Sequence, residues 1–168
     1  YFGLHNDNYI GTLKQPNSVS QNWTEFFDDY RIRPQMQLAQ SNGYLPESVR
    51  LDLEALLQRL PELVDASEPP SPLHGDLWGG NRLIDASGHS WLIDPAFYFG
   101  NREVDLAMMK LFGGFDQVVF DAYAEAFPLP TGWKERTELY QLYPMLVHLN
   151  LFGTSYLGSV ANIVKRYL

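Results

Sequence analysis

Residues 73–81 read LHGDLWGGN and place a histidine, an aspartate, an asparagine and a tryptophan among three glycines. Glycine lets a backbone adopt turn conformations and approach neighbouring chain closely. A surface turn and a catalytic loop would both use such residues, and a His-Gly-Asp triplet alone is more typical of a surface turn. The sequence on either side of the segment decides between these two interpretations.

Two short apolar runs follow the segment, RLID at 82–85 and SWLID at 90–94, and a glycine-containing turn separates them. This pattern predicts a β-hairpin. The hairpin would return Asp94 to the neighbourhood of Asp76 and Asn81, so that three oxygen-bearing side chains converge.

Magnesium takes oxygen ligands and keeps few protein carboxylates. Asn81 and Asp94 suit that role, and Asp76 is placed to orient a hydroxyl and accept its proton. The combination favours a catalytic loop over a surface turn. Further on, Glu103 either braces the site through a hydrogen bond or simply favours the start of a helix.

Helices are expected on both sides of this polar hairpin. Before it, helical spacing and capping residues predict one stretch from Asn22 to Asn42-Gly43, split or kinked at Pro34, and a second helix from about Pro46 toward Leu60. After it, we expect helices near 103–111 and 116–126 and a helical region from 134 to the end, broken near Gly153. The fold class is therefore mainly α with a short β-hairpin, in one domain.

Composition excludes several classes of protein. The formal net charge is −8 and basic residues form no run, which argues against a nucleic-acid partner. The absence of cysteine removes disulfides, thiolate zinc sites and thiol nucleophiles, and it fits a reducing, cytoplasmic location. No apolar stretch approaches the roughly 20 residues that a membrane span needs. We expect no membrane association.

The remaining aromatic and histidine residues have mostly structural interpretations. His5, His89 and His148 are scattered without the spacing of a zinc site, and His148 is expected to pack on a helix. Trp78 differs, because a tryptophan within a polar glycine loop has less reason to be part of the core. The sequence FGGF at 112–115 follows a predicted helix, so we expect a turn there instead of a phosphate-binding loop.

The segments HGDLWGGN and LIDPAFYFGNREVDLAM resemble the catalytic and metal-binding segments of the fructosamine kinase (ketosamine-3-kinase) family. That family belongs to the aminoglycoside-phosphotransferase and protein-kinase-like group. The similarity extends through NYIGTLKQPN upstream and LYQLYPMLVHLNLFGTSYL downstream, and so covers nearly the whole chain. It implies an ATP-dependent and Mg²⁺-dependent kinase that phosphorylates a sugar hydroxyl of ketosamines, such as fructosamine or ribulosamine, free or on glycated amines.

Carried over residue by residue, the resemblance makes Asp76 the catalytic base and Asn81 and Asp94 the magnesium ligands. His74 resembles the residue that braces the catalytic loop. Asp105 resembles a buried carboxylate that caps backbone amides of that loop. Trp78 resembles a tryptophan beside the acceptor site, where its face would stack on a sugar-amine substrate.

The chain departs from the family pattern in one respect. Kinases of this group carry an N-terminal lobe with a phosphate-covering loop and a lysine for the phosphates, and none of the four lysines lies in such a strand-like setting. We therefore expect residues 1–168 to be the C-terminal lobe of a protein-kinase-like fold, with the nucleotide lobe absent from the chain. Such a lobe would be inactive alone, and its apolar interface would favour a homodimer.

Two alternatives remain beside the kinase. An isolated lobe could act as a binding module or be an inert fragment. A metallophosphoesterase also uses Asp, His and Asn near glycines, but the chain lacks the Asp-x-His, Gly-Asp-x-x-Asp and Gly-Asn-His spacings that such enzymes need.

Overall fold

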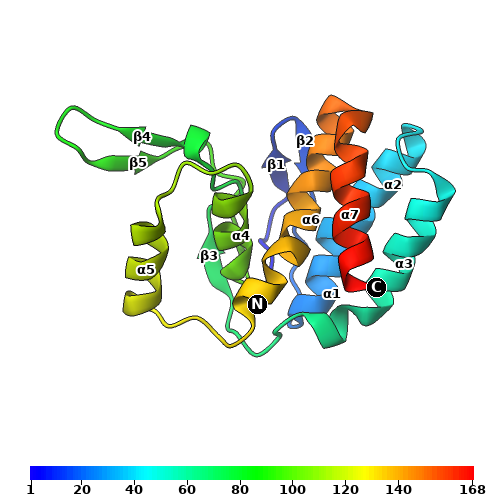
Figure 1. Cartoon of the computed structure of the whole chain (residues 1–168), viewed down its shortest axis with the longest axis horizontal. Coiled ribbons are helices and arrows are strands. Elements are labelled where there is room, and N and C mark those ends of the chain that lie inside the picture. Colours follow the sequence, from blue (N-terminus) through cyan, green and yellow to red (C-terminus); the bar gives the residue numbers. More distant parts are fainter.

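The largest part of the molecule is a helical bundle built around one long helix. The computed structural model describes residues 1–168, and α6 (Trp133–Phe152) runs through its centre. Helices α2 (Arg33–Ser41), α4 (Glu103–Leu111) and α7 (Leu157–Tyr167) all pack against α6 (Figure 1). Because every one of its residues from 139 to 147 is buried, α6 supplies the centre of the hydrophobic core.

The first helical stretch begins where the sequence predicts. The Asn22 side chain accepts hydrogen bonds from the Thr24 and Glu25 amides, so it caps α1 (Trp23–Phe27). The expected break near Pro34 takes the form of a five-residue π-helical segment, Asp28–Ile32, which leads into α2. Pro34 then lies in the first turn of α2.

The next helix, α3 (Glu47–Leu63), runs slightly longer than expected. It buries Leu53, Leu56 and Leu60 on one face, as their spacing predicts. The helix continues through Pro61 to Leu63, whereas the sequence suggested an end near Leu60.

The fold is mainly helical, as predicted, but its β structure is more extensive than the single hairpin that the sequence suggested. Three two-stranded antiparallel sheets are present. Their strands are β1 (Asn8–Ile10) with β2 (Leu13–Gln15), β3 (Ser71–Leu73) with β6 (Tyr98–Gly100), and β4 (Arg82–Ile84) with β5 (Ser90–Leu92). Only the last pair is the expected hairpin. The pairing of β3 with β6 joins three-residue segments that are far apart in sequence. Three residues are too few to show the alternation of apolar and polar side chains from which a strand is predicted.

Two elements stand away from the bundle. The β4–β5 hairpin projects from the body, and α5 (Gln117–Ala126) lies outside α4 (Figure 1). The FGGF segment is a turn between α4 and α5, as expected, with Gly113 and Gly114 both at positive φ. After α6, a 3₁₀ turn (Thr154–Tyr156) follows Gly153 and leads into α7. No helix of the structure is both long and apolar enough to span a bilayer.

Candidate active site

The LHGDLWGGN segment forms a loop between β3 and β4 whose two polar ends meet. The loop leaves β3 after Leu73 and closes with a single 3₁₀ turn, Gly79–Asn81. Asn81 is buried, and its amide nitrogen donates to the Asp76 carboxylate at 3.1 Å and to the Asp76 carbonyl oxygen at 2.9 Å. The structure therefore fixes the Asp76 side chain from within its own loop.

Asp105 and His74 hold the beginning of the loop. From the first turn of α4, the Asp105 carboxylate accepts hydrogen bonds from the His74 amide at 2.7 Å and the Gly75 amide at 2.9 Å. The His74 ring donates from Nε2 to the Ile93 carbonyl oxygen at 2.9 Å and accepts at Nδ1 from the Asp76 amide at 3.3 Å. This pattern assigns the ring proton to Nε2 and ties the loop to the end of the hairpin.

Two glycines of the loop, Gly75 and Gly80, stand where a side chain would collide with neighbouring atoms. Gly75 has φ +81°, and a Cβ there would collide with the Ala96 carbonyl. A Cβ on Gly80 would collide with the Trp78 ring. Larger residues at these positions would displace the segment after Asp94 or move the Trp78 ring.

Gly79 makes a similar contact with the turn after α4. Its amide donates to the Gly113 carbonyl oxygen at 3.1 Å, and a Cβ on Gly114 would collide with the Gly79 backbone. The FGGF turn therefore supports the catalytic loop directly, although its own sequence is unrelated to the chemistry.

Asp94 lies at the exit of the hairpin, next to the other two polar residues. The Ile93 amide donates to the Asn81 carbonyl oxygen at 3.0 Å, which brings the end of the hairpin onto the loop. Asp94 is exposed and has φ +54°, the only non-glycine residue with positive φ. Such a conformation in a non-glycine residue is frequently associated with a functional site. Asp76, Asn81 and Asp94 are thus neighbours.

The electrostatics of the site oppose ionisation of Asp76. Burial raises the pKa of the Asp76 carboxyl above its ordinary value, and the negative charge of Asp94 raises it further. The hydrogen bond from Asn81 and the electrostatic interactions with the His74 and His148 imidazoles act in the opposite direction. A cation placed between the two carboxylates would relieve their repulsion.

Asn81 and Asp94 carry side-chain oxygen atoms of the kind that Mg²⁺ takes as ligands. Asn81 uses its amide nitrogen on Asp76, which leaves its Oδ1 atom as a ligand, and Asp94 adds an exposed carboxylate. No three His, Cys, Asp or Glu side chains are arranged so that they could hold a metal ion together. Magnesium suits so small a donor set because it keeps several waters and completes its coordination with substrate phosphates.

Asp76 and Trp78 face a cavity of about 290 Å³ between the loop, α4 and α6. Aromatic rings line much of it: Phe112 lies 6.1 Å from Trp78 and 4.7 Å from the His148 ring, measured between centroids. His148 donates from Nδ1 to the Pro144 carbonyl oxygen of its own helix, as expected of a packing residue, yet it also lines this cavity. Its place in the site had no signal in the sequence, because nothing in the pattern of α6 relates it to the loop.

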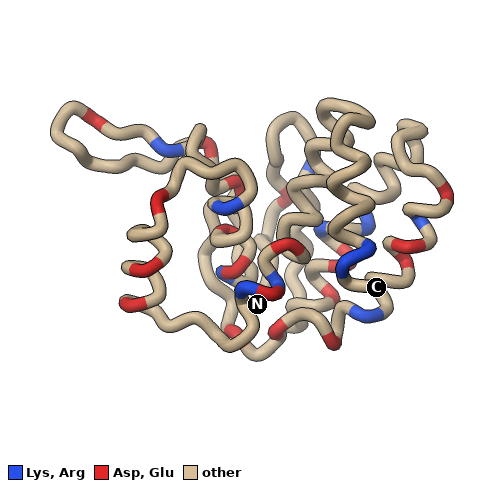
Figure 2. Tube along the Cα trace, in the orientation of Figure 1, with Lys and Arg blue, Asp and Glu red and all other residues tan.

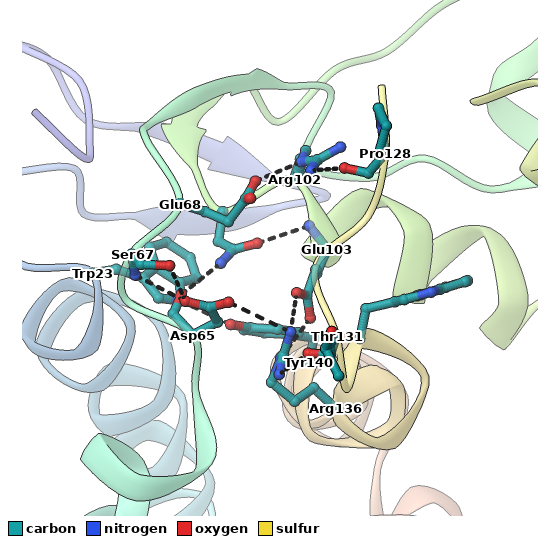
Figure 3. A network of polar contacts seen from close by, with 12 residues as sticks. Trp23, Asp65, Ser67, Glu68, Arg102, Glu103, Pro128, Thr131, Arg136 and Tyr140 are labelled. Carbon is teal, nitrogen blue, oxygen red and sulfur yellow. Dashed lines mark hydrogen bonds and ion pairs between the residues drawn. The ribbon is translucent and has the colours of Figure 1, made fainter. Parts of the chain in front are cut away.

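Glu103 belongs to a buried ion-pair network beneath the site (Figure 3). Its carboxylate, from a residue only 2% exposed, receives two hydrogen bonds from Arg136 of α6 at 2.6 and 2.9 Å. Arg136 also lies 3.9 Å from Asp65 in the segment before β3. Glu103, the first residue of α4, thus links α4 to α6 and makes no side-chain hydrogen bond to the loop.

Comparison with known proteins assigns the class. The chain superposes with a TM-score of 0.93 and 40% identity on the crystal structure of a protein from Thermobifida fusca assigned as a fructosamine-3-kinase, covering 99% of this chain and 58% of that one. A second such structure, from Haemophilus somnus, gives a TM-score of 0.86 at 29% identity, again over 99% of this chain and 56% of the other. The fold is accordingly kinase-like.

The family described as fructosamine kinase matches residues 1–168, and the chain belongs to this family. Curated relatives include a probable ketoamine kinase of Enterococcus faecium, 43% identical over 99% of this chain and 60% of that protein. Another is the ketosamine-3-kinase of Mus musculus, 39% identical over 98% of this chain and 53% of that protein. The chain therefore spans little more than half the length of these relatives.

Proposed function

We propose that the protein is a kinase that transfers the γ-phosphoryl group of ATP to a sugar hydroxyl of a ketosamine. The observation that carries the proposal is the position of Asp76, whose carboxylate is held by Asn81 at the wall of an aromatic cavity. The names of the family and of its relatives supply the reaction class, since they are ketoamine and fructosamine kinases.

In this mechanism the acceptor hydroxyl attacks the γ-phosphorus, the bond from that phosphorus to the β–γ bridging oxygen breaks so that ADP leaves, and Asp76 accepts the hydroxyl proton. Phosphoryl transfer needs little covalent help from the protein, so positioning and charge neutralisation supply most of the acceleration. The pairing of the Asp76 carboxylate with the Asn81 amide fixes one of its oxygens and leaves the other for the hydroxyl. His74 and Asp105 keep the backbone of the loop in this position.

Magnesium, bound through Asn81 and Asp94, would neutralise the charge of the ATP phosphates. The positive φ of Asp94 turns the chain at the hairpin exit, close to Asn81. We assign Asn81 and Asp94 to one ion because the segments that carry them are hydrogen bonded to each other, through the Ile93 amide and the Asn81 carbonyl oxygen.

The cavity beside Asp76 suits the acceptor. Its aromatic rings offer faces to a sugar and to the protonated amine of a ketosamine, since cations are attracted to aromatic faces. Trp78 is 39% exposed, so a large part of its ring is free to contact a substrate. A neutral or anionic acceptor would gain less from this site.

We further propose that residues 1–168 form the C-terminal lobe of the enzyme and that turnover also needs a nucleotide lobe. Lys14 is the one lysine in a strand, the three-residue β2, and its sequence context lacks the V-A-I-K pattern of a lysine that binds the ATP phosphates. A non-catalytic role of this lobe, as a binding module, is the competing hypothesis.

A coupled assay of ATP consumption tests the function in the protein that carries both lobes. We expect turnover with fructosamine or ribulosamine acceptors and much less with the corresponding free sugar or free amine. Equal rates with and without a ketosamine would contradict the proposal. ATP binding or turnover by residues 1–168 alone would contradict the requirement for a second lobe.

A further inference from the structure

Successive side chains of the catalytic loop face two separate cavities. Asp76 and Trp78 line the aromatic cavity, whereas Leu77, between them, lines a second cavity of about 550 Å³. We call this second space the α4–α5 cavity. It lies within the 300–1,000 Å³ range of small-molecule sites.

The walls of the α4–α5 cavity are mostly apolar. Leu106 and Met109 of α4 lie opposite Val119 and Tyr123 of α5, and Leu73 of β3 contributes as well. Phe120 of α5, which contacts Leu106 and Met109, keeps the two helices together. The apolar lining would receive a hydrocarbon or aromatic group released from water.

Two charged residues, Arg102 and Asp105, also line the α4–α5 cavity, and only Arg102 is paired with a side chain of opposite charge. Arg102 is already neutralised: its guanidinium donates to Glu68 at 2.6 Å, to the Phe127 carbonyl oxygen at 2.9 Å and to the Pro128 carbonyl oxygen at 2.6 Å. It has little to offer an anionic ligand.

Asp105, in contrast, has no cationic side chain paired with it. Its two carboxylate oxygens accept one backbone hydrogen bond each, although a carboxylate has about four lone-pair sites. The neighbouring segment 115–127 adds three acidic residues and no basic one, and the charged positions that Figure 2 colours along α5 are all acidic. At the cavity wall itself, an ammonium group would meet the Asp105 carboxylate, which has no cationic partner, whereas the Arg102 guanidinium is already paired.

From this geometry we propose that the α4–α5 cavity is a second ligand site and that it binds an apolar amine. The apolar body would lie between α4 and α5, and the ammonium group would pair with Asp105. Such a ligand would contact Leu77 and Asp105, one within the catalytic loop and one that holds its backbone, so binding would alter the loop. The effect on phosphoryl transfer rests on the proposed function, whereas binding itself does not.

Calorimetric titration with three probes of one shape tests the site: 4-phenylbutylamine, 4-phenylbutanol and 4-phenylbutyrate at pH 7. We expect saturable one-to-one binding of the amine, weaker binding of the alcohol, and at least tenfold weaker binding of the carboxylate. No binding of the amine, or equal binding of the carboxylate, would overturn the proposal.

Three variants locate the bound amine. Val119→Trp should fill the α4–α5 cavity and abolish binding, whereas Val118→Trp, on the exposed side of the same helix, should not. Leu151→Trp narrows the aromatic cavity and should leave amine binding unchanged. If Leu151→Trp abolishes binding and Val119→Trp does not, the amine occupies the aromatic cavity and the proposal is wrong.

A charge test covers the case in which Val119→Trp fails to fold. Asp105→Asn should bring the affinity of the amine down to that of the alcohol and leave the alcohol unchanged. An undiminished preference for the amine would show that Asp105 is not its partner. Because all these readouts are binding constants, they are independent of any kinase activity.

Discussion

At the scale of single residues, Asp76 has the most direct part in the proposed chemistry. We expect Asp76→Asn to lower kcat by about 10²- to 10⁴-fold, the usual contribution of a general base, with little change in KM. The isosteric replacement keeps an acceptor for Asn81 but cannot take a proton. Steady-state kinetics of the two-lobed protein give the comparison, and Asp29→Asn, an exposed position remote in sequence, is the matched control. A rate equal to that of the wild type would remove Asp76 from its role.

The raised pKa of Asp76 also predicts an effect on stability. Folding raises this pKa above its ordinary value of 3.8, so ionisation of Asp76 costs the folded state free energy at neutral pH, and this cost vanishes once pH falls below 3.8. Asp76→Asn removes the cost. We therefore expect the variant to melt at a higher Tm than the wild type at pH 7, with the gain shrinking toward pH 3.5. A lower Tm at neutral pH would contradict the inferred environment of the carboxyl.

Ionisation of Asp76 should raise the activity, although it lowers the stability of the fold. The base works only when ionised, so the acid limb of the rate profile should have its midpoint above 3.8. The profile of kcat/KM against pH, which reports ionisations of the free enzyme, measures it directly. A midpoint at or below the ordinary value would indicate that another group controls the limb.

The Glu103–Arg136 pair should contribute to stability far more than the exposed pair of Arg166 and Glu138. The Glu103 and Arg136 side chains are 2% and 14% exposed, so Glu103→Ala would leave a mostly buried guanidinium with only the Thr131 carbonyl oxygen and the more distant Asp65 as partners. We expect a loss of about 3 kcal/mol in the free energy of unfolding. Glu138→Ala, in a pair that is 43% and 58% exposed, should cost about 0–1 kcal/mol. Denaturant unfolding of both variants makes the comparison, and equal losses would contradict it.

At the scale of elements, the turn after α4 supports the loop through glycine-to-glycine contact. Gly113 and Gly114 both have positive φ, but only a Cβ on Gly114 meets the Gly79 backbone. Gly113→Ala should therefore cost about 1 kcal/mol of backbone strain and spare activity. Gly114→Ala should cost more and reduce kcat, because it displaces the Gly79–Asn81 turn. Thermal melts and kinetics of the two variants separate these effects; the same loss of kcat in both would refute the contact.

The helices could be predicted from the sequence because each carries several turns of apolar spacing and a recognisable boundary, such as the Asn22 cap. The β3–β6 pairing could not, since each strand has only three residues and the partners meet only in the folded chain. The hairpin was predictable from two apolar runs around a glycine turn.

The candidate site could likewise be predicted only in part from the sequence. The Asp76-to-Asn81 spacing and the return of Asp94 by the hairpin follow from local sequence. The cavity beside them does not: His148 and Phe112 come from the end of α6 and the turn after α4, and only packing brings them to Trp78. The role of the FGGF turn as a support for Gly79 likewise depends on a contact between distant segments.

At the scale of the whole molecule, the helical bundle forms a rigid base for one loop and one hairpin. A core of 30 buried residues joins the N-terminal segment, α1 to α4, α6 and α7, so the elements that carry Asp105 and His148 are fixed relative to each other. The site residues Asp76 and Asp94 lie at the edge of this base. The nucleotide lobe that we propose would complete the active site at this edge.

The central claim is that Asn81 and Asp94 hold one cation next to Asp76. Mn²⁺ bound in the presence of ATP to the two-lobed protein, measured by electron paramagnetic resonance titration, tests it most directly. We predict a bound Mn²⁺ ion whose affinity falls at least tenfold in both Asn81→Leu and Asp94→Asn and stays unchanged in Asp29→Asn. Unchanged Mn²⁺ affinity in Asn81→Leu and Asp94→Asn would contradict the claim.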